Sequence, residues 1–179
     1  MRCFLAVEIP EEVKSSLNAV ISDANKLGVA ASFCRPEQLH ITLLFLGEKS
    51  YAQVKEIQSR LSALDFPKFP VSIQGAGFFP NDDYVRVFWA GAECKNNELQ
   101  SLHNAACALL GEKPERVFTG HVTLARIKGV QGLPELKRFK DSLAGRKFGE
   151  FTAGAVVLKK STLGPQGAAY EDLNTFPLK

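Results

Sequence analysis

The sequence predicts an α+β protein of two pseudo-twofold-related lobes, each an antiparallel sheet with two helices, flanking a central cleft. Three observations predict this fold class. The tetrapeptide HITL at residues 40–43 recurs as HVTL at residues 121–124, an offset of 81 residues. Strand-like and helix-like segments follow one another in the same order around both copies. No long linker or low-complexity tract separates the copies, so we expect residues 1–179 to form a single two-lobed domain.

Each half is expected to begin with a strand followed by a helix. The strands are the apolar runs at residues 3–9 and 84–90. In the first half, Pro10 and two glutamates precede apolar residues at helical spacing, and Gly28 can end that helix. In the second half, leucines and alanines at the same spacing lead up to Gly111.

A second helix is expected after each HxTL strand. Ser50 and Gln53 form the pattern of a capping box before the first of these helices, and the second begins near Pro134 and ends before Gly145. Each half then continues into a pair of strands. These pairs are residues 69–79 with 84–92, and residues 151–160 with 168–176, joined by turns rich in loop-forming residues. The aromatic residues between positions 78 and 89 are expected to pack in a hairpin and the core; the other interpretation is that an exposed ring among them stacks on a base.

Composition and charge are those of an ordinary globular protein, with 45% hydrophobic and 23% charged residues. No apolar run approaches the ~18 residues of a membrane span, and the N-terminus does not resemble a cleavable signal, so a cytoplasmic location is expected. The protein is also expected to be a monomer. The net charge is +3, yet residues 113–160 hold eleven Lys or Arg against four acidic residues. This segment is interpreted either as a solvated surface or as a lobe that faces nucleic-acid phosphates.

The four cysteines are expected to be buried free thiols. Cys3, Cys34, Cys94 and Cys107 form no CxxC pair and lack the spacing of a zinc site. Because two of the three histidines belong to the repeated motif, we expect no bound metal and no cofactor. His103 lies in a predicted helix without a partner motif and is interpreted as a residue at the boundary of the core.

The repeated motif points to acid–base chemistry on a phosphodiester. Side chains alternate along a strand, so His40 shares a face with Thr42, and His121 shares a face with Thr123. If the lobes are related by a twofold axis, both pairs meet. One imidazole can then take a proton from attacking water while the other protonates the leaving oxygen, and the hydroxyls can donate to phosphate oxygens. The alternative interpretation is that the histidines only cap strand ends, and the residues alone do not order the acid and base roles.

These motifs, the N-terminal sequence MRCFLAVEI and the chain length resemble the two-histidine (2H) phosphoesterases, closest to the RNA 2′,3′-cyclic phosphodiesterase (2′-5′ RNA ligase) family. The resemblance covers essentially the whole chain. It implies metal-independent conversion of RNA 2′,3′-cyclic phosphate ends to 2′-phosphates, with His40 as the proton donor and His121 as the proton acceptor. For some members it also implies reversible 2′-5′ joining of tRNA halves.

Phe45 and Arg126 stand at matching positions, five residues beyond each histidine. A ring and a guanidinium plane that face each other can hold a nucleobase between them, and the resemblance implies the same use. Strict alternation, however, puts both side chains on the face opposite the histidines. A bulge or a strand end beyond Leu44 and Ala125 is needed to redirect them. Core packing is the other interpretation of Phe45.

Two further functions fit the same motif. A phosphodiesterase for a small nucleotide, such as a cyclic phosphate of ADP-ribose or a 2′-5′ oligoadenylate, would keep the site and change the substrate. A catalytically silent RNA-binding module would not need two proton-transfer groups, so the intact His/Thr pairs disfavour it. The absence of a GxxxxGK[ST] loop disfavours an ATP-driven ligase. Lys128, Lys159 and Lys160 are candidate contacts to an RNA backbone on charge alone.

Overall fold

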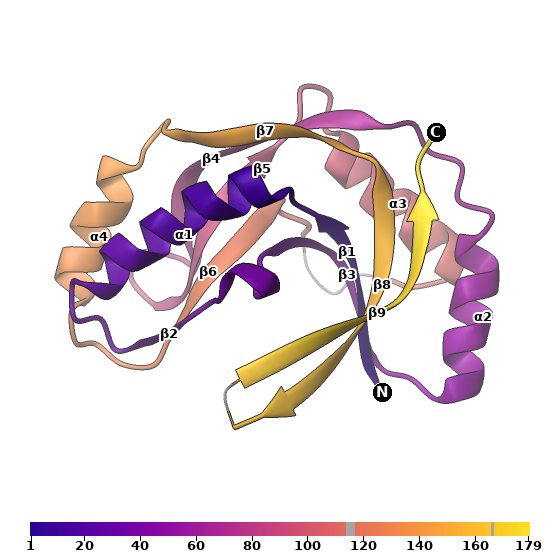
Figure 1. Cartoon of the computed structure of the whole chain (residues 1–179), viewed down its shortest axis with the longest axis horizontal. Coiled ribbons are helices and arrows are strands. Elements are labelled where there is room, and N and C mark those ends of the chain that lie inside the picture. The colour runs from indigo at the N-terminus through magenta and orange to yellow at the C-terminus, as the bar shows by residue number, and fades with distance from the viewer. Residues whose placement is uncertain (114–116, 166) are drawn as a thin grey trace.

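The computed structural model describes residues 1–113, 117–165 and 167–179, which form four α-helices and a curved sheet of nine strands (Figure 1). The elements, in chain order, are β1 (Arg2–Glu8), α1 (Glu11–Asn25), β2 (Ala31–Phe33), the 3-10 helix η1 (Pro36–Gln38), β3 (His40–Glu48), α2 (Tyr51–Leu61), β4 (Phe69–Pro80), β5 (Val85–Glu93), α3 (Glu98–Leu110), β6 (His121–Ile127), α4 (Leu133–Ser142), β7 (Lys147–Ala153), β8 (Ala155–Gly164) and β9 (Gly167–Pro177). The strand order is β7-β4-β5-β6-β3-β1-β8-β9, and β2 pairs with β6.

Strands β3 and β6 join the two halves of this sheet. They pair antiparallel through Ile41 and Val122. On its other side β3 pairs with β1, and β6 pairs with β5, so the two joining strands lie in the middle of the strand order. The sheets that the sequence assigns to two lobes are therefore one continuous antiparallel sheet.

The helices cover the sheet with apolar faces. In α1 the buried residues recur at intervals of three and four positions, as an amphipathic helix requires; they are Val13, Leu17, Val20, Ile21 and Ala24. This helix packs on β6 and β7, and α4 packs on β4. Helix α3 packs on β3 and against α2. The two pairs of helices therefore lie at opposite sides of the molecule, α1 with α4 on the left of Figure 1 and α2 with α3 on the right.

The local signals that predict the helices are confirmed. Helix α1 begins directly after Pro10, and Gly28 follows its last turn with a φ of 70°. Gly111 ends α3 with the same left-handed φ of 70°. The capping box of α2 is also present, because Ser50 Oγ accepts the Gln53 N–H at 3.3 Å and Gln53 Oε1 accepts the Ser50 N–H at 2.8 Å.

One predicted strand is wrong. The sequence predicts a single strand over residues 151–160, but the structure divides this segment at Gly154. Before Gly154, β7 pairs with β4 at one end of the strand order, and after it β8 pairs with β1 and β9. The sequence does not reveal the division because it depends on partner strands that are distant in the chain. The turn predicted between residues 160 and 168 lies where β8 meets β9, although residue 166 is outside the described residues.

All four cysteines are free thiols, and the prediction of burial holds fully for two of them. Cys3 and Cys107 are buried, whereas Cys34 and Cys94 are half-buried. Burial raises the pKa of each of these thiols.

Within the described parts of the chain, no helix has the length and apolar character needed to cross a membrane.

Replacing Ser50 by alanine removes the oxygen that accepts the Gln53 N–H at the start of α2. We expect the free energy of unfolding to fall by about 1 kcal/mol, measured by urea denaturation. Ser15→Ala, at an exposed position inside α1, is the control and should change stability by less than about 0.5 kcal/mol. Equal effects of the two substitutions would contradict the capping role.

Candidate active site

His40 and His121 are the first residues of β3 and β6, the two strands that join the halves of the sheet. Because Ile41 pairs with Val122, each histidine stands next to the point where these strands meet. The side chains of Ile41 and Val122 are fully buried, whereas both histidines are partly exposed on the other face. Burial is the largest cause of the low pKa of His40, and the charge of His121 adds to it, as expected for two imidazoles that share one site.

Thr42 and Thr123 lie on the same face as the histidines. Continuing the antiparallel register by one residue to each side faces each histidine with the threonine of the other strand. Within β3, His40 Nε2 lies 3.1 Å from Thr42 Oγ1. The structure thus brings together the two imidazoles and two hydroxyls that the repeated motif predicts.

A hydrogen bond from Nδ1 to a backbone carbonyl orients each imidazole. His40 Nδ1 lies 2.8 Å from the carbonyl oxygen of Gln38, and His121 Nδ1 lies 2.7 Å from that of Thr119, in each case two residues earlier in the chain. A carbonyl oxygen only accepts, so Nδ1 carries the proton of each neutral ring. Each ring therefore has its lone pair on Nε2, the nitrogen available for proton transfer.

Phe4 and Tyr170 enclose His40. Their ring centroids lie 5.0 Å and 5.2 Å from the imidazole centroid, and Tyr170 meets the imidazole at an interplanar angle of 87°. Tyr170 belongs to the β8–β9 hairpin, which projects at the bottom of Figure 1. Gln38 Nε2 donates to the carbonyl of Ala168 at 2.6 Å, so the residue that orients His40 also holds this hairpin. The contacts of the hairpin with Gln38 and His40 were not predictable from the sequence, because they join segments 130 residues apart.

Phe79 and Trp89 enclose His121. The Phe79 ring stands edge-on to the imidazole with a centroid distance of 4.8 Å, and the Trp89 ring lies 6.2 Å away. The indole covers the backbone of Gly77, where a Cβ would come within 2.2 Å of the ring. The prediction that these aromatic residues pack in a hairpin is correct for β4 and β5, but it did not include their contact with His121.

Burial lowers the pKa of both histidines. The pKa of His40 falls to about 4, first because its surroundings exclude water, and further because of the charges of Lys159, His121 and Lys14. Burial likewise lowers the pKa of His121, and the charge of Arg126 adds to this effect. The hydrogen bonds to the backbone carbonyls act in the opposite direction without cancelling it. Both imidazoles are therefore neutral near pH 7 in the free protein.

Lys159, one of the three candidate contacts to an RNA backbone, is buried and does not lie on the surface. The residue is 7% exposed, and its Nζ lies 2.6 Å from Glu8 Oε1 and 2.5 Å from Asp172 Oδ1. Burial alone would lower the pKa of Lys159, yet the two carboxylates raise it above its ordinary value. Lys159 is thus a permanent buried cation close to the histidine site. Lys160 is half-buried in an ion pair, and Lys128 is exposed.

Phe45 reaches the histidine face because β3 contains a bulge. The pairing of β3 with β1 skips Leu43, so the alternation of faces is reversed after it. Leu43 and Leu44 are consecutive buried residues, and Phe45 is 68% exposed, which excludes core packing. The Phe45 ring centroid lies 6.2 Å from that of Phe4, which contacts His40.

Arg126 reaches the same face through a matching bulge in β6. The pairing of β6 with β5 skips Leu124, and Leu124 and Ala125 are both buried. Arg126 is exposed. Burial lowers the pKa of His121 and the charge of Arg126 adds to this effect, whereas burial raises the pKa of Tyr170 and the charge of Arg126 opposes that rise. The redirection that the sequence analysis requires beyond Leu44 and Ala125 is therefore present in both strands.

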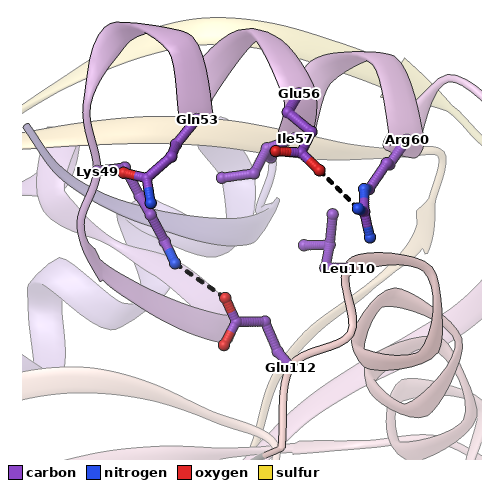
Figure 2. A pocket seen from close by; sticks show the side chains of 7 residues that line it. All are labelled: Lys49, Gln53, Glu56, Ile57, Arg60, Leu110 and Glu112. Atoms are coloured by element: carbon purple, nitrogen blue, oxygen red, sulfur yellow. Dashed lines mark hydrogen bonds and ion pairs between the residues drawn. The ribbon is translucent and has the colours of Figure 1, made fainter.

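A surface hollow of about 110 Å³ lies away from these residues, between α2 and the end of α3 (Figure 2). Its lining residues are Lys49, Gln53, Glu56, Ile57, Arg60, Leu110 and Glu112. The charged groups pair with one another, Lys49 with Glu112 at 2.9 Å and Arg60 with Glu56 at 2.5 Å.

His103, predicted at the boundary of the core, is instead inside it, with 4% of its surface exposed.

Known proteins resemble this chain over nearly its whole length. An RNA 2′,3′-cyclic phosphodiesterase of Methanothermobacter thermautotrophicus is 31% identical, with 99% of both chains covered. One of Methanocaldococcus jannaschii is 36% identical, with 96% of this chain and 97% of the relative covered.

Solved structures share the fold. A crystal structure of a Thermus thermophilus protein has a TM-score of 0.81 at 29% identity, covering 99% of this chain and 97% of that one. Escherichia coli LigT complexed with 3′-AMP has a TM-score of 0.76 at 22% identity, with 99% and 97% covered. The family model described as LigT like Phosphoesterase matches residues 7–89 and 92–170. The chain therefore belongs to the LigT-like phosphoesterases, a family of two-histidine (2H) phosphoesterases.

Proposed function

We propose that this protein opens the 2′,3′-cyclic phosphate at an RNA end to a 2′-phosphomonoester, without a metal ion. His40 is the proton donor and His121 the proton acceptor. The observation that carries the proposal is the pairing of Ile41 with Val122, because it presents two imidazoles and two hydroxyls on one face of the sheet. Displacement at phosphorus needs a base on the attacking water and an acid on the leaving oxygen, which are the two roles that such a pair can fill.

We infer that the two halves are lobes of a single domain related by a pseudo-twofold axis between β3 and β6. Ile41 and Val122 are equivalent under the 81-residue offset and pair with each other, as equivalent residues at a twofold axis do. The bulges at Leu43 and Leu124 are equivalent under the same offset. The match to the family model in two blocks, each containing one HxTL motif, also supports this relation.

The reaction requires two proton transfers. The anionic phosphodiester favours the protonated form of His40, so substrate binding supplies the acid that the free protein lacks at pH 7. Nε2 of His40 then donates to the departing 3′ oxygen while Nε2 of His121 accepts a proton from water, each worth typically ~10²–10⁴-fold in rate. An imidazolium of low pKa is a strong proton donor, which supports the assignment of His40 as the acid.

The hydroxyl groups of Thr42 and Thr123 would donate hydrogen bonds to the two non-bridging phosphate oxygens, where negative charge builds up in the transition state. The 5′ hydroxyl of a second RNA, in place of water, would give a 2′-5′ linkage through the same two proton transfers. Ligation is therefore the reverse of opening that linkage at the same site, and it needs no nucleotide triphosphate.

Phe45 and Arg126 would hold the terminal base. Both side chains are exposed on the histidine face, one from each half of the sheet, and an aromatic ring and a guanidinium group both stack on bases. Solved complexes of Escherichia coli LigT contain ATP, 3′-AMP, NADP⁺ and phosphate, which supports a nucleotide site in this fold. Location in the cytoplasm and a monomeric state stay predictions.

The first test presents a short RNA with a 2′,3′-cyclic phosphate end to the protein in excess EDTA. We expect a 2′-phosphate product, and a loss of at least about 100-fold in kcat for His40→Ala and for His121→Ala. Chromatography against 2′- and 3′-phosphate standards identifies the product. If the folded protein opens only small cyclic nucleotides, the RNA assignment is wrong. If it opens neither, or if one substitution has no effect, the two-histidine mechanism is wrong.

Arg126→Ala should raise the KM for RNA and nucleotide substrates by about tenfold or more, because it removes a plane on which the base stacks. The matched control is Lys128→Ala, an exposed cation two residues further along the chain. Steady-state kinetics measure the KM of both variants with the same substrates. Equal increases in KM would mean that Arg126 contributes only general charge.

His40 should titrate near pH 4 in NMR spectra of the imidazole signals, well below its ordinary value of 6.5. Because the unfolded chain takes up this proton first, stability should fall as the pH drops from about 6.5 toward 4. Lys159→Met should raise the midpoint of His40, since it removes a nearby cation, whereas Lys160→Met serves as the control. A wild-type midpoint near 6.5 would contradict the water-excluding environment.

A further inference from the structure

The bulge in β3 leaves a backbone carbonyl that a helix side chain satisfies. The pairing with β1 skips Leu43, so the ladder between these strands is interrupted there. His103 Nδ1 lies 2.7 Å from the carbonyl oxygen of Leu43. His103 belongs to α3, which packs on β3, and both residues are buried. Since a buried carbonyl without a donor is destabilising, this hydrogen bond favours the bulged form of the strand.

The matching bulge in β6 is satisfied differently. The carbonyl of Leu124, equivalent to that of Leu43, accepts the backbone N–H of Cys34 at 2.8 Å. A main-chain donor is present whatever residue stands at position 34, short of proline. The bulge in β3 instead receives a side chain that a single substitution can remove.

The ring of His103 is fixed as a donor. Its Nδ1 faces a carbonyl and must carry the proton, which leaves a lone pair on Nε2. Cys107 Sγ lies 3.6 Å from Nε2. Because burial raises the pKa of this thiol, Cys107 stays protonated and its S–H donates a hydrogen bond to Nε2. Phe118 stacks on the imidazole with a centroid distance of 4.8 Å and an interplanar angle of 23°.

We propose that His103 is a positioning residue for substrate binding: by holding the Leu43 carbonyl, it keeps the bulge that turns Phe45 toward the face of His40. The inference rests on the proposed function in one respect, namely that Phe45 contacts the base. Because side chains alternate with a period of two, a strand without the bulge would turn Phe45 toward the helices and Leu44 toward the substrate.

Loss of the bulge should affect substrate binding but not the catalytic step. His40 and Thr42 precede the bulge, where they pair with Glu8 and Ala6 of β1. Loss of the His103 hydrogen bond should therefore affect the KM and leave kcat nearly unchanged. A residue that only stabilises the core would lower the melting temperature and leave both kinetic constants of the folded protein unchanged.

The kinetic test uses adenosine 2′,3′-cyclic phosphate as the substrate. His103→Leu removes the donor, and we expect the KM to rise about tenfold with kcat within about twofold of the wild type. His103→Asn keeps an N–H donor and should restore most of the wild-type KM. Asn104→Leu, on the exposed side of α3, is the control. If His103→Leu does not fold, His103→Phe is the second variant without a donor. Equal KM values for the wild type and a folded donorless variant would overturn the proposal.

A double-mutant cycle tests whether His103 acts through Phe45. Phe45→Ala should raise the KM, and adding His103→Leu to it should raise the KM no further. Independent increases that multiply would show that His103 acts by another route and would overturn the proposal.

A labelling experiment separates this proposal from the proposed function. Phe45→Cys introduces a thiol at a position that is 68% exposed, and mass spectrometry of the alkylated peptide follows it apart from the native cysteines. His103→Leu should slow its alkylation about tenfold, because the side chain turns inward. An unchanged rate would overturn the proposal whatever the enzyme's substrate is. If Phe45→Ala leaves the KM unchanged while labelling slows as expected, the role of Phe45 in base binding fails and the positioning role of His103 stands.

Discussion

The pairing of β3 with β6 is the contact on which the active site depends. Ile41 and Val122 meet there, and each is buried among the residues beneath the sheet. A slip of one residue in either strand would move its histidine to the helix-covered face and expose an aliphatic side chain, so burial fixes the register. The chemistry of the site therefore follows from a packing constraint on the opposite face. In both strands the histidine comes first, next to the residue through which the two strands pair.

The two histidines have equivalent positions but different surroundings. Phe4 and Tyr170 exclude water around His40, and Phe79 and Trp89 do so around His121. Near His40, two carboxylates keep Lys159 charged although it is buried, so this cation acts steadily against protonation of the imidazole. A nearly symmetric backbone thus carries an asymmetric field, which gives the two proton-transfer groups different acidities.

The sequence predicted the parts of the site that depend on local pattern. Strand alternation placed His40 beside Thr42, and the 81-residue repeat paired them with the second motif. Features that depend on partner strands were not predictable. The bulge that redirects Phe45 is defined by its pairing with β1, and Tyr170 reaches His40 from a hairpin at the other end of the chain. Composition likewise identified Lys159 as a cation but could not show that it is buried and paired with carboxylates from two other strands.

A crystal structure with a bound 2′-nucleotide product tests the central claim most directly. We expect the phosphate to lie between Nε2 of His40 and Nε2 of His121, with both threonine hydroxyls within about 3.2 Å of its oxygens. The base should contact Phe45 on one side. A phosphate held by only one of the two histidines, or bound instead at the hollow beside Lys49, would contradict the account.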